Sequence, residues 1–417
     1  MQRHIGIVGA GMVGLSTAWF LQERGFGVTV LDRAHPGAGA SWGNAGWLTP
    51  ELTTPLPHPS VLAYGVRALL KPTSPVYVPP TADPRLVRFL TSFARHSTHR
   101  RWARAMRDYV PMNAMALDAF DDLTDGGVDS PTVDADPFLV CFRMVRDRYA
   151  MLAELDEIRA AGQEVKVDVL DGDEVRQVEA TLSTEVGAAL RIHGQRYLNP
   201  PAFVKALADA VQERGGAVVP EADVRKVLDL DDRVALHTAD GRARTFDAVV
   251  AANGAWLNRL VRPFGVRRLV QAGRGYSFSV TGDRLPAGPV YFPTQRVACT
   301  PITSPAGERR LRVAGMMEFR SPEAPLDHRR VDSIVDAVRP LFAGVDLDNR
   351  SDEWVGSRPC TTDGLPLIGR TRSPRVFAAG GHGMWGIAWG PLTGRLLAEQ
   401  VDTGRAPTTL RPFDPLR

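Results

Sequence analysis

Apolar residues near the start of the chain follow two periods that predict a strand, a helix and a second strand. Residues 4–8 (HIGIV) form an apolar run of strand length, and residues 13–24 carry apolar positions at helical spacing that end at Gly25. Residues 28–31 (VTVL) form a second apolar run, which closes on Asp32. This order predicts a βαβ unit.

Strand and helix patterns continue along the rest of the chain. They predict helices over residues 85–107, 147–161 and 328–342, and strands over residues 246–252, 275–280, 296–302, 311–316 and 375–379. Residues 35–60 are rich in Pro, Gly, Ser and Thr, which predicts a long loop. Long irregular segments inside compact domains usually carry function, so we expect this loop to contribute to a site.

Composition and charge are typical of a globular enzyme. The chain has 417 residues, of which 44% are hydrophobic and 23% charged, and its formal net charge is +3. Basic residues are mostly interspersed with acidic ones, which argues against a nucleic-acid-binding tail. Three cysteines without a CxxC pair indicate a reducing compartment. No apolar run approaches the ~18 residues that span a bilayer, and residues 1–22 lack a signal-peptide cleavage site. We therefore expect a cytoplasmic protein.

Residues 85–107 depart from this balance, because they hold seven Arg, two His and no acidic residue. Their apolar positions Leu86, Phe89, Leu90 and Phe93 recur at helical spacing. Two interpretations fit this pattern: a solvated helix pair, or a peripheral contact with the inner face of a membrane.

Gly9, Gly11 and Gly14 form a GxGxxG motif directly after the first strand, and the motif encloses Met12 and Val13. A side chain at the first glycine would spoil the tight turn, one at the second would hold the backbone away from a pyrophosphate, and one at the third would push helix from strand. The start of the helix then offers free N–H groups and a partial positive charge to the phosphates.

Asp32 follows the second strand, 23 residues after Gly9, where a carboxylate can accept hydrogen bonds from ribose hydroxyls. Together with the glycines it predicts a dinucleotide site. Its charge argues against the 2′-phosphate of NADP and leaves NAD and FAD as alternatives. Residues 39–46 (GASWGNAG) and 249–256 (VVAANGAW) are rich in small residues, which let main chain approach a second planar group.

These stretches and four others carry a resemblance that covers nearly the whole chain. The motifs are GxGxxG with Asp32, ASWGNAG (40–46), GAW (254–256), RGY (274–276), RVAGMMEF (312–319), RPCTTDGLPLIG (358–369) and GHGMWGI (381–387). Through them the chain resembles the FAD-dependent D-amino acid oxidase superfamily. It is most similar to the D-amino acid dehydrogenase branch and its glyphosate-oxidoreductase-like relatives.

The resemblance implies an α/β fold of the glutathione-reductase type, with a Rossmann-like FAD-binding domain interleaved with an antiparallel-sheet substrate domain. We expect residues 1–55, 195–260 and 350–417 in the FAD-binding domain, and residues 56–194 and 261–349 in the substrate domain. The cofactor it implies is FAD. The residues expected to bind FAD are Gly9, Gly11, Met12, Val13, Gly14, Asp32, Arg33, Ser41, Asn44, Ala45, Gly46, Val224, Gly254, Trp256, Gly381, His382, Gly383, Met384, Trp385 and Gly386.

Residues 380–391 (GGHGMWGIAWGP) place a glycine-rich turn between a predicted strand and a helix. In the family this turn lies beneath the flavin. Several main-chain N–H groups would converge there on the N1 and C2-carbonyl edge of the ring, which becomes negative when the flavin is reduced. The other interpretation is a glycine-rich crossing packed on the sheet.

The resemblance also assigns three catalytic residues. Arg358 matches the arginine that clamps the substrate carboxylate, and Tyr276 matches an aromatic residue whose hydroxyl would donate a second bond to it. His382 would lie beside the flavin, where it tunes electron transfer or is held by main chain. Met384 stands where glycine oxidases have a second arginine, so we expect a more apolar pocket. Cys360 invites comparison with relatives whose flavin is thioether-linked, although a buried free thiol is the commoner state.

The implied reaction is oxidative deamination of a D-amino acid, with hydride passing from Cα to flavin N5 and electrons passing on to a quinone or another acceptor. The absence of lysine beyond residue 226 favours a dehydrogenase over an oxidase. The alternatives are a glycine or sarcosine-type oxidase, a secondary-amine dehydrogenase acting on D-proline or hydroxyproline, and, in a different class, a nicotinamide-binding or nucleic-acid-associated Rossmann protein. No zinc-spaced Cys/His cluster is present, so we expect no metal.

Overall fold

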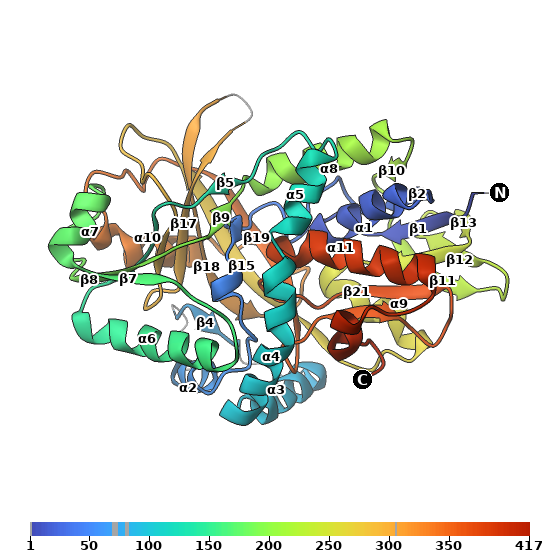
Figure 1. Cartoon of the computed structure of the whole chain (residues 1–417), viewed down its shortest axis with the longest axis horizontal. Coiled ribbons are helices and arrows are strands. Elements are labelled where there is room, and N and C mark those ends of the chain that lie inside the picture. Colours follow the sequence, from blue (N-terminus) through green and yellow to red (C-terminus); the bar gives the residue numbers. More distant parts are fainter. Residues whose placement is uncertain (1, 69–73, 80–82, 305–306) are drawn as a thin grey trace.

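The computed structural model describes residues 2–68, 74–79, 83–304 and 307–417. Within these residues, the strands fall into a six-stranded sheet, a nine-stranded sheet and two small three-stranded sheets. Figure 1 shows the two large sheets in opposite halves of the molecule, with both ends of the chain in the half that holds the six-stranded sheet.

The six-stranded sheet contains the predicted βαβ unit. Its order is β10 (Ala217–Val219), β2 (Gly27–Leu31), β1 (His4–Val8), β14 (Ala248–Ala251), β21 (Val376–Gly380) and β20 (Leu367–Arg370). All neighbouring pairs are parallel except β20 with β21, and β1 pairs with β2 from His4 opposite Gly27 to Val8 opposite Leu31. The carboxyl ends of β1, β2, β14 and β21 therefore meet at one edge, which is where such sheets bind ligands.

Each face of this sheet is covered. On one face, α1 (Met12–Glu23), α8 (Pro200–Glu213) and α11 (Gly386–Thr403) share a core with Ile5 and Ile7 of β1. On the other, Val8 and Val249 pack with α9 (Leu257–Val261) and with the small sheet of β11 (Val224–Asp229), β12 (Val234–Thr238) and β13 (Ala243–Phe246). The alternation of apolar residues along β1 thus serves two cores.

Small residues let α11 cross closely over α1, and Figure 1 shows the two helices side by side. A Cβ on Gly390 would lie 2.5 Å from Cγ of Met12, and one on Gly394 would lie 2.6 Å from the main chain of Ser16. These glycines and Gly386 recur every fourth residue, so they lie along one face of the helix. The contact brings the first turns of both helices to the same edge of the sheet.

The nine-stranded sheet forms the other half. Along its main path lie β19 (Arg350–Thr361), β15 (Val270–Val280), β18 (Arg309–Phe319), β17 (Val297–Thr303), β16 (Val290–Phe292), β6 (Phe138–Phe142), β8 (Ala188–Ile192) and β7 (Val167–Asp171), and β4 (Val76–Tyr77) pairs with β18. On one face, Tyr276, Phe278 and Val313 share a core with α10 (His328–Val338). The opposite face, at Ala298 and Ala314, lines a cavity.

The sheet contains a β-bulge that shapes the site. The pairing of β15 with β18 shifts between Arg274 and Tyr276, so that Gly275 lies opposite both Met316 and Met317. Met316 adopts a left-handed conformation with φ of 66°, which is uncommon for a residue with a side chain. Bulges of this kind redirect backbone groups next to active sites.

The remaining α-helices and the second small sheet complete the fold. They are α2 (Pro59–Ala68), α3 (Pro84–His96), α4 (His99–Met115), α5 (Asp118–Asp125), α6 (Val145–Ala160), α7 (Gly172–Val178) and the small sheet of β3 (Trp47–Leu48), β9 (Arg196–Tyr197) and β5 (Val133–Asp134). The helix expected over 85–107 is two helices, α3 and α4, and the loop expected over 35–60 contains β3 and a 3-10 turn, Pro50–Leu52.

Two segments cross the expected domain boundaries. Strand β19 lies within 350–417, yet it pairs with β15 in the nine-stranded sheet. Helices α4 and α5 lie within 56–194, yet Trp102, Tyr109 and Phe120 pack in the core of the six-stranded sheet. Assignment by sheet and core therefore moves β19 to the substrate half and α4 and α5 to the dinucleotide half.

Among the described residues, no helix is long and apolar enough to span a membrane.

Candidate active site

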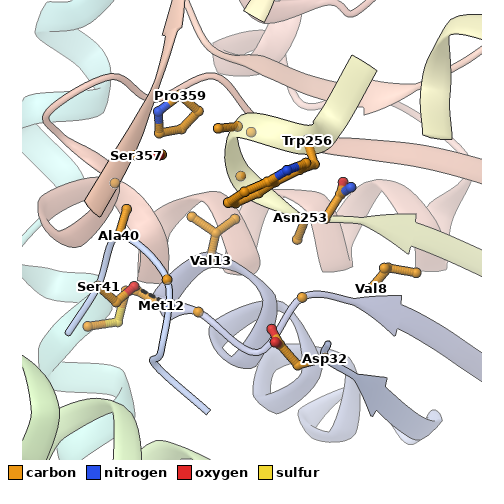
Figure 2. A pocket seen from close by; sticks show the side chains of 18 of the residues that line it. Val8, Met12, Val13, Asp32, Ala40, Ser41, Asn253, Trp256, Ser357 and Pro359 are labelled. Atoms are coloured by element: carbon orange, nitrogen blue, oxygen red, sulfur yellow. Dashed lines mark hydrogen bonds between the residues drawn. The ribbon is translucent and has the colours of Figure 1, made fainter. Parts of the chain in front are cut away.

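A cavity opens at the carboxyl edge of the six-stranded sheet, where the GxGxxG turn lies (Figure 2). Gly9 has φ of 112°, and a Cβ there would lie 2.5 Å from the carbonyl oxygen of Ala252. A Cβ on Gly14 would lie 1.9 Å from the carbonyl oxygen of Gly9, so the third glycine sets the distance between helix and turn. Gly11, Met12 and Val13 line the cavity, whereas Gly14 does not.

Asp32 fixes the turn as well as lining the cavity. Its carboxylate accepts hydrogen bonds from the Ala10 N–H at 2.7 Å and from the Ala34 N–H at 2.9 Å. Burial raises the pKa of this carboxyl, and the two N–H groups oppose that shift. A carboxylate has about four acceptor positions, so Asp32 can still accept bonds from ribose hydroxyls.

The wall opposite Asp32 is formed by the segment after β14. Figure 2 shows the Trp256 ring above Val13, on the far side of the cavity from Asp32. The Arg33 guanidinium lies 3.4 Å from the centre of the Trp256 ring, and Gly254 also lines the cavity, as does Val224 at the start of β11. The side-chain oxygen of Asn253 is buried here without a hydrogen-bond partner. An orphaned acceptor in a cavity wall is expected where a ligand donor belongs.

The loop over residues 39–46 closes the cavity toward the substrate half. The Ser41 hydroxyl accepts a bond from the Met12 N–H at 3.1 Å, which ties the loop to the start of α1. Asn44 lines this cavity and the adjoining one, and Ala45 lines only the second. Gly46 lines neither, and a Cβ there would lie 2.1 Å from the carbonyl oxygen of Leu198. The structure gives Gly46 a packing role, and its contact with FAD stays a prediction.

The glycine-rich turn after β21 faces the same cavity. Gly383 has φ of 57°, lines the cavity, and would place a Cβ where no atom lies within 4 Å. The helix that follows, α11, begins at Gly386 without a side-chain cap, and Gly11 at the start of α1 also provides no side-chain cap. Two helix N-termini thus direct free N–H groups and partial positive charge toward one cavity.

Of the other residues in this turn, Gly381 has a packing role, whereas Met384 and Trp385 line the cavities. A Cβ on Gly381 would lie 2.7 Å from the Thr361 methyl group, so this glycine is required by packing and does not line the cavity. Met384 lines both cavities, and Trp385 lines the second, with its indole N–H donating to the Thr54 carbonyl at 2.7 Å.

His382 is buried in the cavity wall and uncharged. Its Nε2 shares a hydrogen bond of 2.9 Å with the Thr393 hydroxyl, and burial lowers the pKa of the imidazole to about 3. A proton on this ring at neutral pH would be an unpaired buried charge. His382 is therefore held as a neutral hydrogen-bonding group and is not a cation that could stabilise the reduced flavin.

The pH dependence of stability tests this assignment. Because the folded pKa lies below the ordinary value of 6.5, the unfolded chain binds the extra proton, and His382 destabilises the fold as pH falls from 6.5 toward 3. A His382→Gln variant removes this titration while keeping a hydrogen-bonding group beside Thr393. We expect the stability advantage of wild type over the variant to shrink by up to about 1.4 kcal/mol per pH unit in that window, measured by urea unfolding. Parallel pH profiles would contradict a neutral, buried His382.

Arg358 lies where the two cavities meet. It lines both, and its guanidinium donates to the Met316 carbonyl at 2.7 Å, the group that the bulge redirects. It forms no ion pair with any residue that the structure describes. Burial lowers the pKa of this guanidinium because the charged form loses hydration, yet arginine stays protonated. A buried cation without a counter-ion is an anion-binding site.

Gly275 provides the space that Arg358 occupies. A Cβ on Gly275 would lie 2.3 Å from Cζ of Arg358, so any side chain there would displace the guanidinium. The RGY motif therefore contributes its glycine to the site. The sequence signal was present, since a glycine inside a strand marks a close approach.

The predicted role of Tyr276 is corrected by its position. Its side chain is fully buried in the core on the α10 face of the nine-stranded sheet, and it lines neither cavity. Its hydroxyl donates to Glu318 at 2.7 Å, and Arg274 contacts the same carboxylate at 3.4 Å. Tyr276 thus belongs to a buried charge network behind the site, where it cannot reach a substrate carboxylate.

Cys360 lies beside Arg358 on β19 but does not line the flavin cavity. Burial raises the pKa of its thiol to about 12, and Arg358 opposes the shift only in part. A protonated thiol is a poor nucleophile, so its environment gives no support to a thioether link with flavin.

The second cavity has a volume of about 590 Å³ and extends from Arg358 over the face of the nine-stranded sheet. Its walls come from the 44–65 segment, α3, α6 and the strands β16 to β18, and most are apolar. Besides Arg358, two charged side chains interrupt this lining: Glu154 of α6 and Arg296 before β17. The pocket is apolar near Met384, as expected, but it carries two charged side chains where Glu154 and Arg296 line it.

Comparison with known proteins places these features in a family. A family model described as FAD dependent oxidoreductase matches residues 4–400. The chain belongs to this family. FAD is accordingly its cofactor, and the expectation of an FAD-dependent oxidoreductase with this interleaved fold is confirmed.

Relatives and solved structures agree with this assignment. The chain is 32% identical to a D-amino acid dehydrogenase of Methylobacterium radiotolerans, over 97% of this chain and 96% of the relative. It is 29% identical to a D-amino acid dehydrogenase of Agrobacterium fabrum, over 95% of each chain. The fold matches glycine oxidase from Geobacillus kaustophilus with a TM-score of 0.73 at 22% identity, over 100% and 99% of the two chains.

The cavity at the edge of the six-stranded sheet fits FAD. The GxGxxG turn with the start of α1 would hold the pyrophosphate, Asp32 the ribose, and the Gly383 turn with the start of α11 the flavin. The open space at Gly383 and the orphaned Asn253 oxygen are what a bound group would fill.

Proposed function

We propose that this FAD-dependent enzyme oxidises a D-amino acid to an imino acid, which water hydrolyses to a 2-oxo acid. The observation that carries the proposal is Arg358, a buried guanidinium that has no counter-ion among the described residues and lies at the junction of the flavin and substrate cavities. A carboxylate is the ligand that such a fork binds with two parallel charge-assisted hydrogen bonds. The names of the curated relatives support an amino acid as its bearer.

Arg358 orients the substrate more than it activates it. A carboxylate fixed by two bonds restricts where the Cα–H bond can lie, and the Met316 carbonyl in turn fixes the guanidinium. The hydride acceptor is supplied by FAD when it is bound. The uncapped start of α11 would offer N–H groups and partial positive charge to the flavin, which gains negative charge on reduction.

Acid–base groups have a limited part in this chemistry. His382 is held neutral, Tyr276 lies in another core, and Arg358 is a permanent cation. The substrate therefore reacts as the free amine, whose lone pair assists departure of the hydride from Cα. Apolar walls at Met384 and Trp385 keep water away from that bond.

The electron acceptor is proposed to be a quinone or another acceptor in place of oxygen. Lysines beside the flavin assist oxygen reduction in some relatives, and this sequence has none beyond Lys226. Of the lysines that the structure describes, none lines either cavity, and Lys71 lies outside the described residues.

Stopped-flow reoxidation tests the choice of acceptor. After anaerobic reduction by a D-amino acid, we expect reoxidation by a dye or soluble quinone to be at least 10-fold faster than by air-saturated buffer. Rapid reoxidation by air with release of hydrogen peroxide would favour the oxidase alternative. In the same assay, activity confined to D-proline and other N-substituted amines would favour a secondary-amine dehydrogenase.

A further inference from the structure

Two charged side chains of the substrate cavity, Glu154 and Arg296, lack a hydrogen bond or ion pair with the described residues. Glu154 lies on α6 and Arg296 lies just before β17, and both line the cavity that begins at Arg358. Neither side chain forms a hydrogen bond or an ion pair with a residue that the structure describes, and Arg296 only stacks on the Tyr64 ring, 4.8 Å from its centre. Charged groups left unpaired in an apolar wall are expected where a ligand completes them.

The neighbouring charges are already satisfied. Glu157, one turn along α6, accepts from His58 at 3.0 Å and lies 3.4 Å from His99. The Ser60 N–H donates to Nδ1 of His58, and Nε2 of the same ring faces Glu157. This arrangement makes a hydrogen-bonded pair, and Glu154 remains the unpaired carboxyl of the group.

Glu154 and Arg296 line the same cavity, and their opposite charges interact. Burial raises the pKa of Glu154, His58 and Arg296 lower it, and Glu157 raises it. A cation placed beside Glu154 would therefore also meet Arg296, and an anion placed beside Arg296 would meet Glu154. Like charges brought together in a pocket oppose binding, so the pair disfavours either kind of charged ligand.

The sheet sets the distance from Arg358. Arg296 precedes β17, which is separated from β19 by β15 and β18, so three strand spacings of ~4.8 Å separate the two strands by ~14 Å across the sheet. Both arginine side chains extend into the same cavity. An amino acid whose carboxylate is held by Arg358 can then direct its side chain across β18 toward Glu154 and Arg296.

We propose that Glu154 and Arg296 form a side-chain subsite that selects D-amino acids bearing an uncharged carboxamide, the oxygen accepting from Arg296 and the NH2 group donating to Glu154. A carboxamide carries an acceptor and two donors on one carbon, which matches the two unpaired groups without adding net charge. The inference rests on the proposed function, because the side chain is placed by the carboxylate at Arg358.

A substrate panel tests the subsite. Steady-state kcat/KM with a dye acceptor is measured for D-glutamine, D-methionine, D-glutamate, D-lysine and D-alanine, each normalised to flavin content. We expect wild type to prefer D-glutamine over D-methionine, D-glutamate and D-lysine by ~10-fold or more. Similar values for D-glutamine and D-methionine, or a preference for either charged substrate, would overturn the inference.

Two variants separate recognition from structure. Glu154→Leu leaves Arg296 alone, so the ratio of kcat/KM for D-glutamate to that for D-glutamine should rise ~10-fold or more. Arg296→Met leaves Glu154 without Arg296, so the ratio of kcat/KM for D-lysine to that for D-glutamine should rise. Asp156→Asn, an exposed change on the same helix, should leave all ratios unaltered. If both cavity variants lower kcat/KM by the same factor for every substrate, the two residues only support the fold and the subsite is refuted.

Failure of the subsite differs from failure of the proposed function. If D-alanine reduces the dye but D-glutamine has no advantage over D-methionine, the subsite alone is contradicted. If the flavin-loaded protein turns over none of the D-amino acids, the proposed function itself is contradicted, and the subsite is contradicted with it.

Discussion

Arg358→Met is expected to lower kcat/KM for D-amino acids by about 100- to 1000-fold while the protein keeps its FAD. The guanidinium has no counter-ion among the described residues and would pair with the substrate carboxylate. Removing one partner of a buried, hydrogen-bonded charge pair costs about 2–5 kcal/mol. Arg358→Lys is expected to recover only part of the loss, because a lysine cannot make the two parallel bonds. Steady-state kinetics and the flavin-to-protein ratio check this.

Two further variants provide a second test and a control for the Arg358→Met result. Gly275→Ala should act in the same direction, since its Cβ would lie 2.3 Å from Cζ of Arg358 and displace the guanidinium without changing its charge. Arg350→Lys lies on the same strand, at a surface ion pair with Asp332, and should behave like wild type. Normal KM and kcat in the Arg358→Met enzyme would contradict the proposal that Arg358 binds the substrate carboxylate.

Gly14→Ala is expected to abolish stable FAD binding and to lower the melting temperature. The new Cβ would lie 1.9 Å from the carbonyl oxygen of Gly9, so α1 would have to move away from the turn that holds the pyrophosphate. Overpacking of this kind typically costs 1–3 kcal/mol, and displacement of the helix start removes the phosphate-binding N–H groups as well. The flavin content after gel filtration, and thermal unfolding with and without added FAD, measure both effects.

The matched control is Gly282→Ala, at an exposed position where a Cβ would meet no atom within 4 Å. It should bind FAD and melt like wild type. Full flavin occupancy in the Gly14→Ala protein would show that the close contact between helix and turn is not needed for the cofactor.

The dinucleotide half could be predicted because its signals are local. The first strand, the glycine turn, α1 and Asp32 lie within the first 32 residues, and each has a steric or electrostatic reason that the sequence alone displays. The same holds for the Gly383 turn, whose bare backbone between a strand and a helix indicates N–H groups facing a ligand.

The substrate half was predicted less well because its geometry is non-local. Tyr276 was assigned to the pocket, but the pairing of β15 with the bulged β18 places it in the core behind the sheet and presents Gly275 to Arg358. Strand β19 was assigned to the dinucleotide half, and only its pairing with β15 moves it. Glu154 looks like one of many polar residues on a surface helix until α6 is folded over the cavity.

Anaerobic titration of the purified protein tests the central claim most directly, because it reports flavin and substrate together. The account predicts a yellow protein that releases FAD on denaturation and whose flavin absorbance is bleached by a D-amino acid, while the L-enantiomer at equal concentration has no effect. A colourless protein that releases no flavin, or a bound flavin that no D-amino acid can reduce, would contradict it.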